Sequence, residues 1–160
     1  MADKTQAPAI VSAQWPIIDT ASEPIFYDLS FFVEGPARAK QSFRYRRNGH
    51  SFQSARVKGW QADVGWAAQQ AMRQQVDHLD RYPLHDQIAV EMVFFLKPTK
   101  KTGKAARIDL DNLSKGVLDG LNGIAWDDDQ QIIDLHLRKA VCGKNVHPGV
   151  NVFIKEIKPN

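Results

Sequence analysis

The segment Ile88-Ala-Val-Glu-Met-Val-Phe-Phe-Leu96 decides the fold, because eight of its nine residues are apolar. β-Branched and aromatic side chains predominate in it and Pro98 follows closely, so the segment predicts a β-strand that ends before the proline. Apolar residues fall on both alternating faces of such a strand. We therefore expect a central strand that is covered on both faces.

Helices and further strands are predicted on either side of this strand. Before it, Trp60, Val64 and Ala71 recur at helical spacing, which predicts a long amphipathic helix. Trp60 and Trp66 of this helix are assigned to packing, and since they lie on different sides of the helix, one of them could serve a subunit contact. After the central strand, a short helix is followed by two strands with alternating apolar residues. Strands are expected over residues 26–33, 88–96, 132–141 and 150–157, and helices over residues 54–79 and 112–121.

The order β-α-β-α-β-β predicts an α+β fold: a single compact domain with a mixed β-sheet and helices packed on the sheet. The chain has 160 residues, of which 43% are hydrophobic, as is ordinary for one globular domain. Residues 1–24 contain three prolines and no sustained periodicity. We therefore expect a flexible N-terminal tail over residues 1–24 and a domain over residues 25–160.

Composition excludes several classes of protein. Cys142 is the single cysteine, which excludes an internal disulfide framework and a CxxC zinc site. No apolar run is long enough to span a bilayer, and the first residues lack the pattern of a secretory signal, so we expect a cytoplasmic protein without a membrane partner. The net charge of +3 is mildly basic, and the placement of the charges is more informative than their sum.

The segment Asp109-Leu-Asp-Asn-Leu-Ser-Lys115 places two carboxylates and an amine near the start of a predicted helix. Asp109 and Asp111 are two residues apart, so in extended backbone their side chains leave by the same face. The N-terminus of a helix favours negative charge. Lys115 follows Asp111 by four residues and lies one turn along the same side once the helix has started.

These carboxylates are a candidate metal site. Two carboxylates this close repel one another unless a proton or a cation lies between them. Oxygen ligands favour a hard cation, Mg²⁺ or, as a substitute, Mn²⁺. A third carboxylate from the acidic run Asp127-Asp-Asp129 would complete the ligand set once folding has brought the two segments together. Such a site activates water and stabilises the charge that develops as a phosphodiester is cut, with Lys115 steadying the phosphate or the leaving oxygen.

Plain structural roles fit the same residues one at a time. Asp109 and Asp111 alone are typical of helix capping, and a short acidic run such as residues 127–129 is typical of a solvated turn before a strand. Lys115 could pair with Asp119 on the helix surface. The coincidence of these residues with two basic segments favours the metal site.

Residues 36–53 and 97–108 contain no acidic residue, and each segment has five lysines or arginines. Such groups neutralise phosphates and give an affinity for nucleic acid that depends on salt and is independent of sequence. Phe43, Tyr45 and Phe52 in the first segment fit either stacking on unpaired bases or core packing. The candidate DNA contacts are Arg38, Lys40, Arg44, Arg46, Arg47, Lys100, Lys101 and Lys104.

The acidic motifs resemble those of a known family. The stretch Asp109-Leu-Asp-Asn-Leu-Ser-Lys-Gly-Val-Leu-Asp-Gly-Leu-Asn122, followed by Asp128-Asp-Gln-Gln-Ile-Ile-Asp-Leu135, is similar to the RusA family of Holliday-junction resolvases. Upstream, the order of strand, basic loop and long helix agrees in pattern. The resemblance implies that Asp109, Asp111 and Asp129 are catalytic carboxylates that bind Mg²⁺, with Asp128 as the fallback third ligand, and that Lys115 is the catalytic lysine.

The resemblance also implies a small homodimer that cuts four-way DNA junctions in a bacterial or phage-infected cell. A junction has two-fold symmetry and needs two opposed cuts, so a symmetric dimer supplies two matched sites. We therefore expect a Mg²⁺-dependent, structure-selective endodeoxyribonuclease that acts on branched DNA. One alternative is a branched-DNA-binding protein that does not cleave. Another is a nucleotide-sugar transferase that uses Asp109-x-Asp111 on Mn²⁺, for which 160 residues leave little room.

Overall fold

The computed structural model describes residues 27–39, 44–45, 51–52, 54–105, 107–143 and 145–158, with the backbone alone for residues 44, 45, 51 and 52. The tail predicted over residues 1–24 lies outside these ranges, so the boundary at residue 25 stays a prediction.

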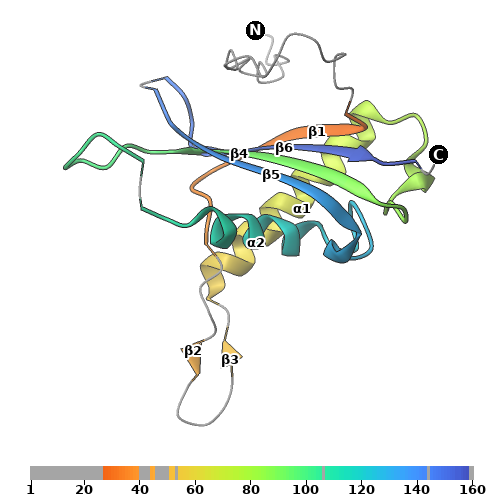
Figure 1. The fold of residues 1–160 in the computed structure, drawn as a ribbon, viewed down its shortest axis with the longest axis horizontal. Helices are drawn as coiled ribbons and strands as arrows, with labels where there is room; N and C mark the ends of the chain where they lie inside the picture. Colours follow the sequence, from red (N-terminus) through yellow and green to blue (C-terminus); the bar gives the residue numbers. More distant parts are fainter. Residues whose placement is uncertain are drawn as a thin grey trace, which may run out of the picture.

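Four strands form the main sheet, in the order β1-β6-β4-β5 (Figure 1). β4 and β5 are parallel, whereas the other neighbours are antiparallel, so the sheet is mixed. The strands are β1 (Leu29–Glu34), β4 (Ile88–Leu96), β5 (Ile132–Val141) and β6 (Gly149–Glu156), and the helices are α1 (Ala55–Gln75) and α2 (Leu110–Leu121). This confirms the predicted α+β fold and the order β-α-β-α-β-β. Shorter elements are the paired strands β2 (Arg44–Tyr45) and β3 (Ser51–Phe52) and the 3₁₀ turns η1 (Leu79–Arg81) and η2 (Asp129–Gln131).

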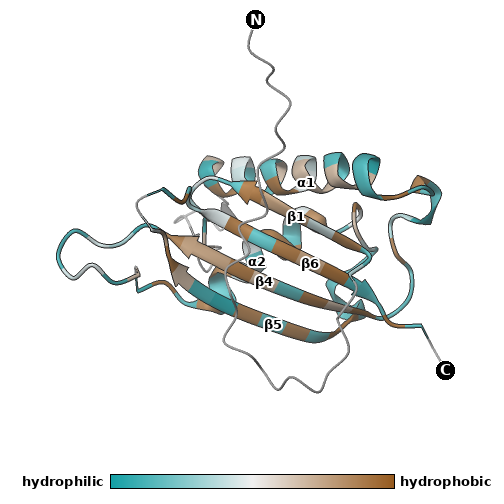
Figure 2. Cartoon of the chain, turned by 90° about the horizontal axis from the view of Figure 1, so that it is seen from above, coloured by the Kyte–Doolittle hydropathy of each residue, from teal (hydrophilic) through white to brown (hydrophobic). Residues whose placement is uncertain are grey.

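β4 lies inside the sheet and is apolar on both faces, as predicted. Its residues Ile88, Met92 and Phe94 are fully buried in the main core, under the helices. On the other face, Val93 and Phe95 form a smaller cluster with Cys142. Figure 2 shows this second face, with α2 behind the sheet and α1 along the edge beside β1. The sheet is therefore covered by helices on one side only, and a local apolar cluster protects the other side.

α1 and α2 pack directly on each other because glycines let their backbones approach. A Cβ atom on Gly116 would lie 2.6 Å from the carbonyl oxygen of Arg38, and one on Gly120 would lie 2.7 Å from that of Gln61. Trp60 lies beside Gly116 and Val64 beside Gly120, so the two helices run in the same direction where they touch. Both helices therefore begin at the same end of the molecule.

Two details of α1 differ from the prediction. The helix ends at Gln75 rather than near residue 79, and the chain continues to η1, where Arg81 donates to Asp28 at 3.2 Å and to Glu156 at 2.7 Å. Trp60 is buried, whereas Trp66 is 65% exposed and does not pack in the core of this chain, so a subunit contact through Trp66 stays a prediction. Trp66 lies six residues after Trp60, so its side chain points to a different side of the helix, away from the buried stripe. Within the described ranges, no helix is both long and apolar enough to cross a membrane.

Candidate active site at the start of α2

Asp109 and Asp111 lie on either side of the first residue of α2. The helix begins at Leu110, two residues earlier than predicted, so Asp109 is its N-cap residue and Asp111 lies in its first turn. Only Asp109 has the extended backbone that was expected for both. Its side chain makes no capping hydrogen bond, so the carboxylate of Asp109 is not used to satisfy the helix N–H groups.

Lys115 lies one turn after Asp111 and is bound to it, as the spacing predicts. The Lys115 Nζ donates to Oδ2 of Asp111 at 3.1 Å, and both side chains are more than half exposed. This hydrogen bond lowers the pKa of Asp111 below its usual value. Asp119, the alternative partner, accepts a hydrogen bond from the side-chain amide of Gln61 at 3.0 Å.

The start of α2 is fixed by buried apolar side chains and by a hydrogen bond from β5. Leu113, Val117 and Leu121, spaced by four residues, are fully buried. Just before the helix in the sequence, the carbonyl oxygen of Ile108 accepts a hydrogen bond from Nζ of Lys139 in β5 at 2.8 Å. The two carboxylates are therefore attached to a fixed element, which suits a site that must keep its geometry.

Asp127 and Asp128 of the acidic run before β5 each make a local contact. Asp127 pairs with Nδ1 of His85 at 2.6 Å, and this contact raises the pKa of the imidazole. Asp128 is the N-cap of η2, where its carboxylate accepts from the N–H of Gln130 at 2.9 Å. Asp129 begins η2. The fallback ligand Asp128 is thus already engaged in a cap, whereas Asp129 is not the capping residue.

The two acidic motifs lie at opposite ends of β5. Asp109 is near Lys139, which contacts Ile108, whereas Asp129 lies just before Ile132. The span from residue 132 to residue 139 of a strand is about 23 Å. α2, which separates the motifs, is itself about 18 Å long. In agreement, no group of three or more Asp, Glu, His or Cys side chains among the described residues could hold a metal ion.

One folded chain therefore does not bring the three predicted carboxylates together. The expectation that folding of a single chain joins the two acidic segments is wrong. The reason is topological: α2 is a rigid rod that returns the chain from the far end of β4 to the start of the parallel strand β5. Asp109 and Asp111 fit a hard divalent cation, since both are oxygen donors and the Asp109 carboxylate is not consumed by the helix. The catalytic roles of Asp109, Asp111, Asp129 and Lys115 stay predictions.

A basic loop leads directly into this site. Lys100, Lys101 and Lys104 are exposed on the loop between β4 and α2, which is closed by a hydrogen bond from the Thr99 N–H to the Lys104 carbonyl oxygen at 2.9 Å. Arg38 belongs to the segment that packs on Gly116 of α2. Of the other candidate DNA contacts, Lys40, Arg46, Arg47 and the side chain of Arg44 lie outside the described part of the chain.

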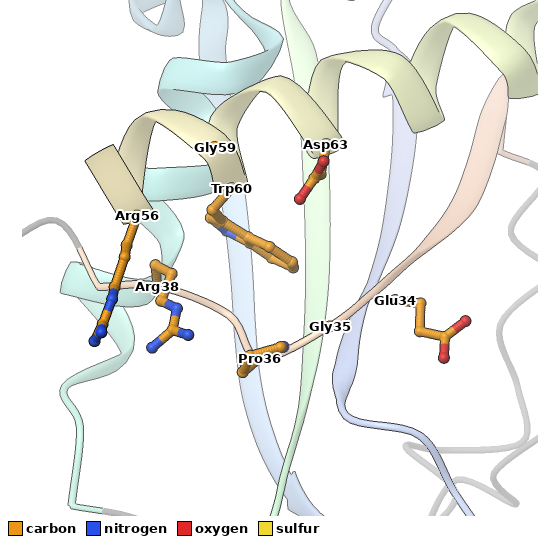
Figure 3. Close-up of a pocket in the computed structure, with 8 residues that line it drawn as sticks. All are labelled: Glu34, Gly35, Pro36, Arg38, Arg56, Gly59, Trp60 and Asp63. Atoms are coloured by element: carbon orange, nitrogen blue, oxygen red, sulfur yellow. The ribbon is translucent and has the colours of Figure 1, made fainter. Parts of the chain in front are cut away.

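The sequence prediction missed Arg56, which lies in the first turn of α1. Together with Arg38 it lines a pocket of about 210 Å³ between this turn and the segment that follows β1 (Figure 3). The other lining residues are Glu34, Gly35, Pro36, Gly59, Trp60 and Asp63. The available signal was a basic residue two positions after the N-cap Ser54, but the acid-free segment was taken to end at residue 53.

Comparison with known proteins gives the family. No curated protein matches the chain. A family model does match, over residues 34–155, and its description is endodeoxyribonuclease RusA. The matched region contains both helices, the basic loop and all the predicted catalytic residues, and it confirms the resemblance of the acidic motifs. Because the match covers most of the chain, the protein belongs to the RusA family of endodeoxyribonucleases.

Proposed function

We propose that the protein resolves four-way DNA junctions as a homodimer, by Mg²⁺-dependent hydrolysis of one phosphodiester in each of two opposed strands. RusA membership implies junction-resolving endonuclease activity. The observation that carries the proposal is the arrangement of Asp109, Asp111 and Lys115 at the start of α2, directly after a basic loop.

Asp109 and Asp111 would hold the divalent ion, which when bound supplies a Lewis acid and a water of lowered pKa. The chain's own groups prepare the site. Lys115 keeps Asp111 ionised and fixes the position of its carboxylate through the 3.1 Å hydrogen bond. The same ammonium group, with the N–H groups of the first turn of α2, favours the negative charge that develops on the phosphate.

The third carboxylate would be the partner's Asp129. Since the two acidic motifs lie at opposite ends of β5, an antiparallel pairing of two protomers would bring the beginning of one β5 to the end of the other. β5 is an edge strand of the sheet, and Ile133 and Leu135 on it are 55% and 40% exposed. Exposed apolar side chains on an open edge favour a partner strand.

Mixing two inactive variants tests both parts of the proposal. Asp111→Asn and Asp129→Asn homodimers should each fail to cut a four-way junction with Mg²⁺, while the parent cuts it. In a mixed dimer, one composite site carries both substitutions and the other carries none. Re-equilibrated mixtures should therefore regain activity, seen as nicked junctions on a denaturing gel.

Asp77→Asn, an exposed change on the segment after α1, is the matched control and should cut like the parent. If the two inactive variants stay inactive when mixed, the three carboxylates do not come from two protomers. If the parent binds the junction but does not cut it with Mg²⁺ or Mn²⁺, the proposed function is wrong and a non-catalytic branched-DNA-binding protein remains.

A further inference from the structure

The pocket beside α1 has its positive charges at one end. Arg38 comes from the segment after β1 and Arg56 from the first turn of α1, and Figure 3 shows their guanidinium groups side by side and pointing the same way. Glu34 lies at the other end of the pocket and points away from them. Trp60, only 4% exposed, forms a wall between the two ends.

The two arginines are not neutralised by acidic neighbours in the described part of the chain. The first turn of α1 contains no acidic residue. The ion pairs between described residues do not include Arg38 or Arg56, and Glu34 is paired with His147 at 3.0 Å. Asp63 lines the pocket on the far side of Trp60. Two adjacent cations repel one another, and an anion held between them relieves that repulsion.

The geometry selects a phosphate over a base as the occupant. A base would need an open aromatic face to stack on, and the ring of Trp60 is almost wholly buried. Guanidinium groups bind phosphate oxygens in forked, charge-assisted hydrogen bonds, which suits a pair of arginines better than any stacking contact.

The pocket is next to the predicted catalytic helix. The Arg38 carbonyl oxygen packs on Gly116, whose chain neighbour is Lys115, and Lys115 in turn binds Asp111. Since α1 and α2 begin at the same end of the molecule, Arg56 lies at that end as well. A DNA strand that reaches Asp109 and Asp111 therefore has the arginine pair beside its path.

We propose that Arg38 and Arg56 form a second phosphate-binding site, which holds one phosphodiester of the DNA strand away from the one that is cut. The identification of the anion as DNA rests on the proposed function. The pairing of the two arginines on a single phosphate, and the inclusion of Arg56, go beyond it.

Junction binding without divalent metal tests the site independently of cleavage. The dissociation constant of a fluorescent four-way junction is measured in EDTA at several salt concentrations, for the parent, Arg38→Gln, Arg56→Gln and the double variant. Loss of one phosphate contact should weaken binding roughly ten-fold and reduce the slope of log affinity against log salt by about 1. Because the two arginines share one phosphate, the double variant should lose little more than either single variant.

Arg73→Gln is the matched control, since it removes the same charge from the last turn of the same helix. The proposal is overturned if Arg56→Gln binds like Arg73→Gln, or if the effects of the two substitutions multiply. Arg38→Lys, which keeps the charge but not the fork, replaces Arg38→Gln if the latter lowers the thermal midpoint. A parent that binds but never cuts would refute the proposed function and leave the phosphate site standing. If the parent cuts the junction while all arginine variants bind it normally, the phosphate site is refuted and the proposed function stands.

Discussion

The carboxylate of Asp111 accepts a hydrogen bond from Lys115 in the chain itself, without a metal ion. Lys115 donates to Oδ2 of Asp111, whereas the side chain of the N-cap residue Asp109 makes no hydrogen bond to the helix. The two carboxylates therefore differ. The ammonium group of Lys115 keeps Asp111 ionised and oriented, whereas the Asp109 carboxylate is available to another ligand. A divalent cation that binds both would have to share Asp111 with Lys115.

Lys115→Met should raise the pKa of Asp111 toward the ordinary aspartate value, because the hydrogen bond from Lys115 is the main cause of its depression. The sign for stability follows: the pair stabilises the folded state above the ordinary pKa, and this contribution is lost as pH falls through the lowered folded pKa. Carbon-detected NMR titration of the aspartate side chains measures the shift. Lys58→Met, an exposed change on α1, should leave Asp111 unaffected, and an unchanged Asp111 titration in Lys115→Met would contradict the assignment.

His85 is expected to titrate above its ordinary pKa of about 6.5, because Asp127 binds its ring. Asp127→Asn should lower that pKa. The pair's contribution to stability is fully present below the ordinary pKa and is lost as pH rises through the raised folded pKa. Ring-nitrogen NMR across this pH range checks the prediction, with Asp134→Asn as a control that should not move His85. A His85 pKa that is unchanged in Asp127→Asn would show that the contact does not form in solution.

At the scale of elements, the contact between α1 and α2 positions the site. Because Gly116 and Gly120 have no side chains, the backbone at Arg38 lies close to Gly116 and the backbone at Gln61 lies close to Gly120. The two helices therefore approach closely and start at the same end. The charged first turns of both helices therefore share one end of the molecule, although they are more than fifty residues apart in the chain.

Gly116→Ala should destabilise the fold by about 1–3 kcal/mol, because the new Cβ would lie 2.6 Å from a backbone oxygen that cannot move without shifting the segment. Gly59→Ala on α1 is the matched comparison. A Cβ there meets nothing within 4 Å, so the better helix propensity of alanine should stabilise by roughly 0.5–1 kcal/mol. Urea unfolding measures both, and equal effects of the two substitutions would show that α2 is not in close contact with the segment at Arg38.

The sequence predicted the elements well where local chemistry sets their ends. β4 and β5 have the predicted bounds, since Pro98 follows one strand and apolar alternation marks the other. α2 begins at Leu110 rather than at Asn112, because Asp109 occupies the N-cap. The pairing of Lys115 with Asp111 was likewise predictable, as it depends only on helical spacing.

The assembly of the three carboxylates was not predictable from spacing. Residues 111 and 129 are close in sequence, yet a straight helix and a turn carry them to opposite ends of a strand. That separation depends on the parallel pairing of β4 with β5, which is a tertiary property. Arg56 was missed for a similar reason, since its partner Arg38 approaches it only through the packing of the segment after β1.

At the scale of the whole molecule, the edge strand β5 is the surface most suited to a second copy. Three of the five large hydrophobic residues that are exposed within the described ranges, Ile133, Leu135 and Val141, belong to it. Pairing along this edge would set the partner's side chains beside them on the same face and would also satisfy the backbone groups of the edge.

Leu135→Lys should reduce the mass measured by light scattering from that of a dimer to about that of the 18.0 kDa chain, because it places a charge in the proposed interface. Junction cleavage should fall with it. Leu79→Lys, at an exposed leucine of η1, is the control and should remain dimeric. If Leu135→Lys also stays dimeric, the protomers meet through a different surface.

Cys142 follows the last residue of β5, is 7% exposed, and donates its backbone N–H to the Leu96 carbonyl oxygen at 2.8 Å. Burial raises the pKa of its thiol. As the chain's sole sulfhydryl, it is a built-in reporter, because an alkylating reagent should reach it mainly when the cluster that it forms with Val93 and Phe95 opens. Its labelling rate would thus record how often this cluster at the end of β5 opens, without any introduced probe.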